Sequence, residues 1–106
     1  MGLALPQLTT EERREALKKA ASARKRRSEI SVDLKAKRIS LPDVLELAKE
    51  DEALAKMRVS ALLKSLPRVG PHRAERIMEE IGIARSRRLQ GLGSVQREKL
   101  LEYFEK

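Results

Sequence analysis

Residues 66–74 of the chain read LPRVGPHRA, and this stretch decides how the sequence is interpreted. Gly70 lets the backbone turn sharply and lets an external group approach without a side chain in between. Pro71 lacks an N–H but is well tolerated at the first position of a helix. A helix that begins there leaves the backbone N–H groups of Gly70, His72 and Arg73 directed outward at its positive end. This arrangement predicts a site for an anion such as phosphate.

Arginines surround this turn and a second one further along the chain. Arg68 and Arg73 flank the first turn, and the second turn carries three more, Arg85, Arg87 and Arg88. A tight loop with solvated arginines is the plainer interpretation of one such turn. Five arginines around two turns instead favour a surface that binds a polyanion.

The sequence reads as all-α, with about five helices and no run of alternating β-branched residues long enough for a strand. Thr9 with Glu12 fits a capping box that opens a long first helix, and Ser40 with Asp43 opens a short second helix. Gly82 predicts the end of the fourth helix. The expected helices cover about residues 10–38, 41–50, 53–66 and 71–81, followed by a last helix with Ser94 as its N-cap.

The first helix differs from the others, because it contains the cationic run at residues 24–27 and only a thin apolar stripe. Burial of that stripe is too small to fix the helix against a body. We expect an arm that extends away, anchored near Ile30, Leu34 and Ile39, and partly mobile until a polyanion neutralises it. The predicted organisation is a basic arm at residues 1–50 and a compact helical body at residues 51–106.

Charge is distributed unevenly along the chain, which has 24 Lys and Arg against 16 Asp and Glu. Residues 10–38 hold eleven basic and five acidic side chains, residues 41–59 hold three and five, and residues 60–97 hold eight and three. Two basic blocks therefore flank a mildly acidic one. The net charge of +8 favours a polyanion as the partner.

Composition excludes several classes of function. The chain has no cysteine and His72 is its one histidine, so we expect no metal site, no cofactor and no catalytic residue. Tyr103 and Phe104 are expected to pack in the core, which argues against a single-strand binder that stacks bases on aromatic rings. No apolar run approaches the roughly 20 residues that span a bilayer, so we expect a soluble cytoplasmic protein without membrane contact.

Residues 62–104 resemble the helix-two-turn-helix element shared by DNA-repair glycosylases and a small ribosomal subunit protein. The stretch AKMRVSALLKSLP at residues 55–67, the module after it and the basic arm are similar, more narrowly, to the actinobacterial integration host factor family. This second resemblance covers residues 10–106. It implies a nucleoid-associated protein that binds duplex DNA with little sequence preference, alters DNA topology and compaction, and supports phage integration.

The resemblance implies two sets of DNA contacts, both to the phosphate backbone rather than to base edges. In the body, with the flanking cations included, they are Arg68, Val69, Gly70, His72, Arg73, Arg85, Arg87, Arg88, Ser94 and Arg97. In the arm they are Lys18, Lys19, Arg24, Lys25, Arg26 and Arg27. The expected partners are double-stranded DNA and a phage integrase on shared DNA, with the protein a monomer in solution.

Three other functions use some of the same features. A glycosylase with this module would need an N-terminal proline or a similar amine, a β-sandwich and a zinc finger, whereas this chain begins Met1-Gly2-Leu3. A ribosomal-type protein clasps RNA with the same module and stays the alternative, although its basic extension is expected after the module and not before it. A module that docks onto an acidic partner helix would not need the phosphate-binding geometry expected at Gly70.

Overall fold

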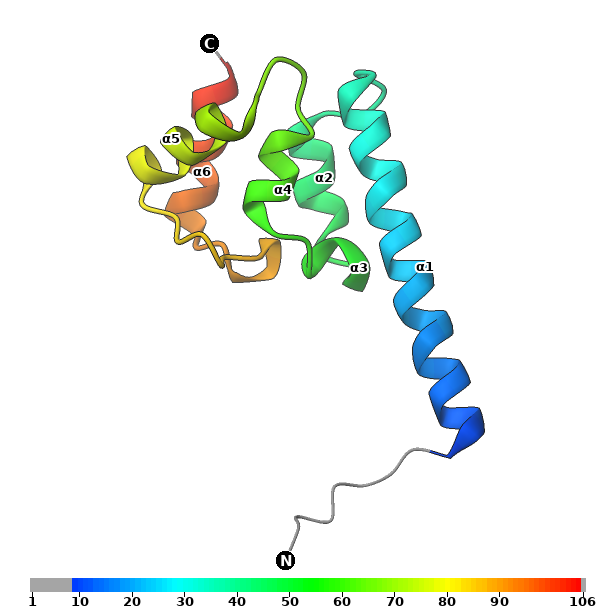
Figure 1. The fold of residues 1–106 in the computed structure, drawn as a ribbon. Helices are drawn as coiled ribbons and strands as arrows, with labels where there is room; N and C mark the ends of the chain where they lie inside the picture. The colour runs from blue at the N-terminus through cyan, green and yellow to red at the C-terminus, as the bar shows by residue number, and fades with distance from the viewer. Residues whose placement is uncertain (1–8, 106) are drawn as a thin grey trace, which may run out of the picture.

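The structure, a computed structural model, describes residues 9–105 and is all-α, as the sequence predicts (Figure 1). The helices in chain order are α1 (Thr10–Lys35), α2 (Leu41–Leu47), α3 (Glu52–Ala55), α4 (Val59–Lys64), α5 (Pro71–Ile81) and α6 (Ser94–Glu105). A short 3-10 turn, η1 (Leu89–Gly91), precedes α6. Within this part of the chain, no helix combines the length and the hydropathy that crossing a membrane requires.

Each of the first three helices has a side-chain N-cap. The Thr9 hydroxyl accepts a hydrogen bond from the N–H of Glu12 at 3.1 Å, which is one of the two bonds of the predicted capping box. Ser40 and Asp43 open α2 as predicted, and they form a full capping box, in which each side chain bonds the other residue's backbone N–H. Asp51 caps α3 by accepting from two backbone N–H groups. These caps fix where the chain enters each helix.

The prediction of one helix over residues 53–66 is wrong, because the chain breaks between α3 and α4. The Met57 carbonyl accepts from the N–H of Leu89 at 2.9 Å, and the N–H of Val59 donates to the Arg87 carbonyl at 3.0 Å. An isolated antiparallel bridge between Arg58 and Arg88 results. Backbone groups that pair with a distant loop are not free to continue a helical ladder. The apolar spacing of this stretch does not reveal that pairing.

The first helix ends at Lys35 rather than at Arg38. Lys37 adopts a left-handed conformation with φ 62°, and the N–H of Arg38 then donates to the Asp33 carbonyl at 2.8 Å. This is a Schellman motif. Its left-handed position is usually a glycine, and here it is Lys37. The predicted end at Gly82 is confirmed: its φ is 84° and the next N–H donates to the Met78 carbonyl.

One hydrophobic core joins all parts of the fold. Helices α1 and α2 contribute buried side chains to this core, such as Ile30, Leu34 and Val44. Helices α4, α5 and α6 contribute others, such as Leu62, Ile77 and Leu100. The sequence places a boundary at residue 50, and that division stays a prediction. Because Ile30 and Leu34 are buried, any deletion meant to leave a folded body has to stop before them.

The outer part of α1 lies outside this core. Residues 9–22 are all exposed, and Leu17 keeps 70% of its surface accessible. Figure 1 shows α1 running beside α2 and α3 and then projecting past the body toward its N-terminal end. The anchors predicted at Ile30 and Leu34 are confirmed as buried, and Ile39 is half-buried against the core.

Candidate nucleic-acid interface

The turn between α4 and α5 does not place its glycine in the left-handed region. Gly70 has φ −88° and ψ 180°, which is an extended conformation. A residue before proline is pushed toward extended conformations, which explains this value. The left-handed residue of the turn is Arg68, with φ 65°. A Cβ added at Gly70 would meet nothing within 4 Å in the protein.

The N-terminus of α5 has no side-chain cap, unlike those of α1, α2 and α3. Pro71 opens the helix and Gly70, His72 and Arg73 are exposed beside it. The first backbone N–H groups of a helix have no partner within the helix, so here they remain free for an external acceptor. Together with the positive end of the helix dipole, they are suited to bind a phosphate oxygen.

Cations flank this uncapped end. Arg68 and Arg73 are both exposed, and the guanidinium of Arg73 lies 3.5 Å from the carbonyl oxygen of Arg68, to which it donates. Val69, between Arg68 and Gly70, is buried, so its side chain anchors the turn. The fold therefore presents two guanidinium groups and the helix N-terminus on one short segment, which is the arrangement that the sequence predicts for the first turn.

The second turn is held against the rest of the body by its own arginines. Arg88 donates to the Lys56 carbonyl at 2.7 Å, and Arg87 donates to the Gly91 carbonyl at the same distance. Arg85 forms an ion pair with Glu75 of α5 at 2.6 Å, although the arginine side chain stays 82% exposed. These contacts shape the turn and leave guanidinium N–H groups available to an anion.

Ser94 and Arg97 lie at the start of α6. Ser94 is the first residue of the helix and not the residue before it, because the N–H of Arg97 bonds the Gly93 carbonyl. The predicted N-cap is therefore one residue too late. Gln96 takes over the capping by accepting from the N–H of Gly93 at 3.1 Å. The exposed hydroxyl of Ser94 is left uncommitted by this arrangement.

Arg97 also links two helices. Its guanidinium donates to the Leu45 carbonyl at 3.0 Å, near the C-terminal end of α2, where carbonyls have no partner within the helix. We expect Arg97→Met to lower the free energy of unfolding by about 1 to 2 kcal/mol, because a half-buried carbonyl loses a charged donor. Urea denaturation measures this, with the exposed Lys99→Met as the matched control. Equal stability of the two variants would show that the link is dispensable.

The cations of the arm divide into two groups. Lys18, Arg24 and Lys25 are exposed and form no hydrogen bond or ion pair with the rest of residues 9–105. The other three contact the body. Arg26 bonds Asp51 at 2.9 Å, Arg27 donates to the Ala53 carbonyl at 3.4 Å, and Lys19 lies 3.8 Å from Glu52. In this structure α1 is therefore docked along α3 by polar contacts, which the sequence does not predict.

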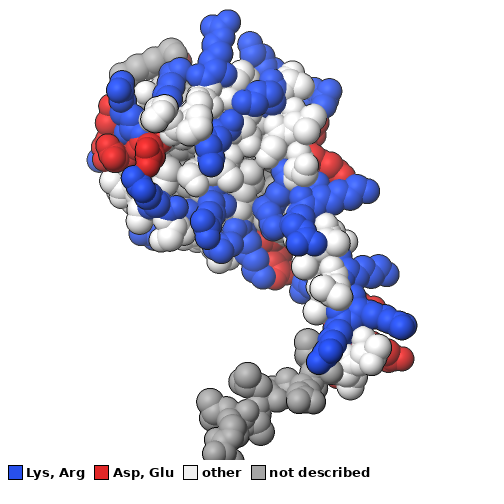
Figure 2. Space-filling view, viewed as in Figure 1, with Lys and Arg blue, Asp and Glu red and all other residues white. Residues whose placement is uncertain are grey.

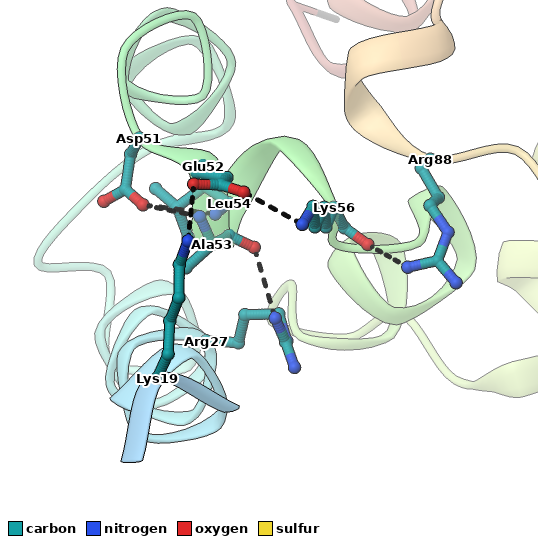
Figure 3. Close-up of polar contacts among 8 residues, drawn as sticks. All are labelled: Lys19, Arg27, Asp51, Glu52, Ala53, Leu54, Lys56 and Arg88. Atoms are coloured by element: carbon teal, nitrogen blue, oxygen red, sulfur yellow. Dashed lines mark hydrogen bonds and ion pairs between the residues drawn. The ribbon is translucent and has the colours of Figure 1, made fainter. Parts of the chain in front are cut away.

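A cleft of about 710 Å³ separates α1 from α3. Its lining combines small side chains with cations from α1 and from the body, and it comprises Ala16, Lys19, Ala20, Ser22, Ala23, Arg24, Arg26, Arg27, Glu52, Ala53, Lys56 and Arg88. Figure 3 shows Arg88, from the second turn, and Lys19, from the arm, on opposite sides of α3. The cleft therefore brings Arg88 of the second turn and the cations of the arm to one surface.

Two carboxylates hold this surface together. A hydrogen bond from Lys56, followed by the charges of Lys19 and Lys56, lowers the pKa of Glu52. Burial raises the pKa of Asp51, but hydrogen bonds from Arg26 and Leu54 outweigh burial and lower it below its ordinary value of 3.8. At a pH above 3.8, ionised Asp51 therefore stabilises the fold. This contribution is lost as the pH falls through the lowered pKa of Asp51.

Figure 2 shows lysine and arginine side chains spread over the body and continuing along the projecting part of α1, with few acidic side chains among them on this face. Sequence reasoning missed two of the cations involved. Lys56 lines the cleft, and Lys35 donates to the carbonyls of Lys64 and Leu66, which bonds the end of α1 to the first turn. Neither has a local sequence signal, because both roles depend on contacts between distant segments.

Comparison with known proteins agrees with this arrangement. Residues 34–104 match the family model described as an S13-like H2TH domain. The chain is 54% identical over 102 residues to an integration host factor of Mycobacterium tuberculosis, covering 96% of this chain and 97% of that one. It is 53% identical to the integration host factor of Mycolicibacterium smegmatis, with 97% and 98% covered. For that of Streptomyces coelicolor the identity is 52%, with 89% and 88% covered.

A solved structure described as "Structure of sIHF bound to an 8bp palindromic DNA" has the same fold. Its TM-score to this chain is 0.80 at 48% sequence identity, and the match covers 82% of this chain and 98% of that one. The sequence matches to the two mycobacterial relatives span nearly the whole length of the chain. This chain belongs to the integration host factor family and contains its S13-like H2TH domain.

Proposed function

We propose that this protein is a non-enzymatic, nucleoid-associated protein that binds duplex DNA through the phosphate backbone with little sequence preference. The observation that carries the proposal is the uncapped N-terminus of α5, where exposed Gly70 and Pro71 are followed by Arg73 and preceded by Arg68. Free N–H donors beside two guanidinium groups match the geometry of a phosphate and offer nothing specific to a base. The DNA in the solved structure of sIHF supports the same partner for this chain.

The proposed contact surface has two parts. On the body, the contacts are Arg68, Val69, Gly70, His72, Arg73, Arg85, Arg87, Arg88, Ser94 and Arg97, with the buried Val69 contributing backbone only. On the arm, they are Lys18, Lys19, Arg24, Lys25, Arg26 and Arg27. We propose that Lys18, Arg24 and Lys25 bind phosphates most directly, because the other three already have partners on α3.

The arm extends the reach of the protein along DNA. At 1.5 Å per residue, the 26 residues of α1 span about 39 Å, which exceeds the roughly 34 Å of one helical turn of DNA. A protein that holds phosphates both on its body and on a projecting arm constrains the path of the duplex between them. We propose that this constraint is how the chain influences DNA topology and compaction in the cytoplasmic nucleoid and helps a phage integrase on shared DNA, acting as a monomer.

A second candidate is a ribosomal-type protein that binds structured RNA, since the matching family model is itself S13-like. Helix N-termini and arginines bind RNA phosphates as readily as DNA phosphates. The basic extension of this chain, however, precedes the module, in α1. The arm before the module and the DNA-bound relative favour duplex DNA.

A comparison of nucleic acids at one fixed salt concentration tests the proposal. Duplex DNA of several unrelated sequences, a structured RNA hairpin and single-stranded DNA are titrated against the protein in a filter-binding assay. We expect similar affinities for all duplexes and weaker binding to single strands, because the chain has two aromatic residues and both lie in the last helix. Preferential binding of the RNA hairpin would favour the ribosomal-type candidate instead.

A further inference from the structure

We infer that Asp51, an acidic residue within a DNA-binding protein, strengthens DNA binding by holding the arm in position. The inference rests on the proposed function, because it concerns how the arm presents its cations to phosphates. It predicts an effect of unusual sign: removing a negative charge at this position weakens the binding of a polyanion. Simple electrostatics predicts the opposite for an ordinary surface carboxylate.

The position of Asp51 between two elements is the first observation. One carboxylate oxygen, Oδ2, accepts from Nε of Arg26 on α1 at 2.9 Å, and the other, Oδ1, accepts from the N–H groups of Ala53 and Leu54 on α3. The carboxyl side chain is 26% exposed, so the pair with Arg26 is partly shielded from solvent. A single carboxylate thus caps α3 and bonds α1 to it at the same time.

The scarcity of other contacts along the arm is the second observation. Toward its N-terminal end from Ile30, α1 buries no side chain fully, and residues 9–22 are exposed. The remaining polar contacts with α3 are weaker: Arg27 donates at 3.4 Å, and Lys19 approaches Glu52 at 3.8 Å between well-exposed side chains. Outside its buried anchors, the arm therefore has its shortest polar contact with α3 in the bond between Arg26 and Asp51, and this bond restrains it most.

The consequence for binding follows from preorganisation. Lys18 and Lys25 are exposed cations on the N-terminal side of this bond, about two helical turns apart on one face of α1, and they contact the DNA held by the body only if α1 stays aligned with the body. A loosened arm loses conformational freedom when DNA binds, and this ordering opposes binding. Asp51 acts through Arg26 and does not touch DNA, so it is a positioning residue.

Asp51→Asn is the variant that isolates this role. Asparagine is a good N-cap, so its Oδ1 retains the bonds to Ala53 and Leu54, whereas its amide nitrogen cannot accept from Arg26. Glu50→Gln is the matched control, because it removes the same charge from the adjacent residue, which is exposed and forms no ion pair within residues 9–105. We expect Asp51→Asn to bind duplex DNA about 3- to 5-fold more weakly, and Glu50→Gln to bind as well as the natural protein or slightly better.

A distance measurement in free protein gives a readout independent of DNA. The chain has no cysteine, so spin labels can be attached at Leu17→Cys on the arm and Val95→Cys on α6, both at exposed positions. The distribution of distances between the labels should broaden in Asp51→Asn and in Arg26→Met but not in Glu50→Gln. Methionine has no donor, so Arg26→Met breaks the same bond while leaving the cap of α3 intact, and a folding defect in Asp51→Asn does not decide the test.

The last part of the test asks whether the effect of Asp51→Asn on DNA affinity depends on the cations of the arm. In a protein whose Lys18, Arg24 and Lys25 are already glutamine, Asp51→Asn should change DNA affinity by less than 2-fold, about the accuracy to which independent sites add. In an Arg73→Gln background its full effect should persist. If Asp51→Asn binds as tightly as Glu50→Gln, with an unchanged label distance, the inference is overturned while the DNA-binding function stands. If the natural protein itself fails to bind duplex DNA, the proposed function fails, and the label distances still test the positioning role.

Discussion

A protein with Lys18, Arg24 and Lys25 all replaced by glutamine should bind duplex DNA on the order of 30- to 100-fold more weakly near physiological salt, if all three contact phosphate. These side chains are exposed and have no partner within residues 9–105, so their removal breaks no ion pair of the fold. Glutamine has nearly the helix propensity of lysine and arginine, so α1 is retained. Fluorescence anisotropy with a labelled duplex measures the loss.

The control for this variant removes the same charge elsewhere. Arg38, Lys49 and Lys99 are exposed cations outside the proposed surface, and their triple replacement by glutamine leaves the net charge equal to that of the arm variant. We expect it to weaken binding by only a few-fold, through the general field of the protein. If both triple variants lost affinity equally, net charge alone would explain the binding and the arm would have no special role.

Two glycine substitutions should separate DNA affinity from stability. Gly70→Ala should reduce affinity for every duplex by about 10-fold, because a Cβ at the uncapped end of α5 obstructs several N–H donors at once. Its stability should change by less than about 0.5 kcal/mol, since φ is −88° and the added Cβ meets nothing within 4 Å. The loss of affinity should also exceed that of Arg68→Ala, which removes one cation and leaves the donors in place.

Gly82→Ala is the complementary control at the other end of the same helix. Its φ of 84° strains any side chain, so we expect about 1 kcal/mol lower stability and unchanged DNA affinity in the folded protein. Urea denaturation and DNA titration are carried out on both variants. Unchanged affinity in Gly70→Ala would mean that the turn has only a structural role and that arginines and the arm provide the binding.

Local signals in the sequence predict much of this fold correctly. The N-caps Thr9 and Ser40 are found where expected. So are the proline that begins α5 and the glycine that ends it. Each depends on bonds between residues three to five apart, which a pattern reports directly. The uncapped turn before α5 is predicted for the same reason.

The errors have two origins. Two are local: the end of α1 depends on a left-handed lysine at position 37, and Ser94 lies one residue inside α6. The others arise where distant segments meet, as at the break between α3 and α4, which depends on backbone pairing with residues 87–89. The docking of α1 involves Asp51, which belongs to the mildly acidic block of the sequence. Neither periodicity nor charge counting reports such contacts, because the partners lie 25 to 32 residues apart in sequence.

The salt dependence of binding tests the central claim most directly, because contacts with phosphates release counterions and contacts with base edges do not. With about four to eight phosphates engaged, log K for a duplex plotted against log salt concentration should fall with a slope of about −4 to −7. The slope should be the same for unrelated duplexes, and about 3 units shallower in the Lys18, Arg24 and Lys25 triple variant. A nearly flat slope, or strong discrimination among unrelated duplexes, would contradict binding through the phosphate backbone.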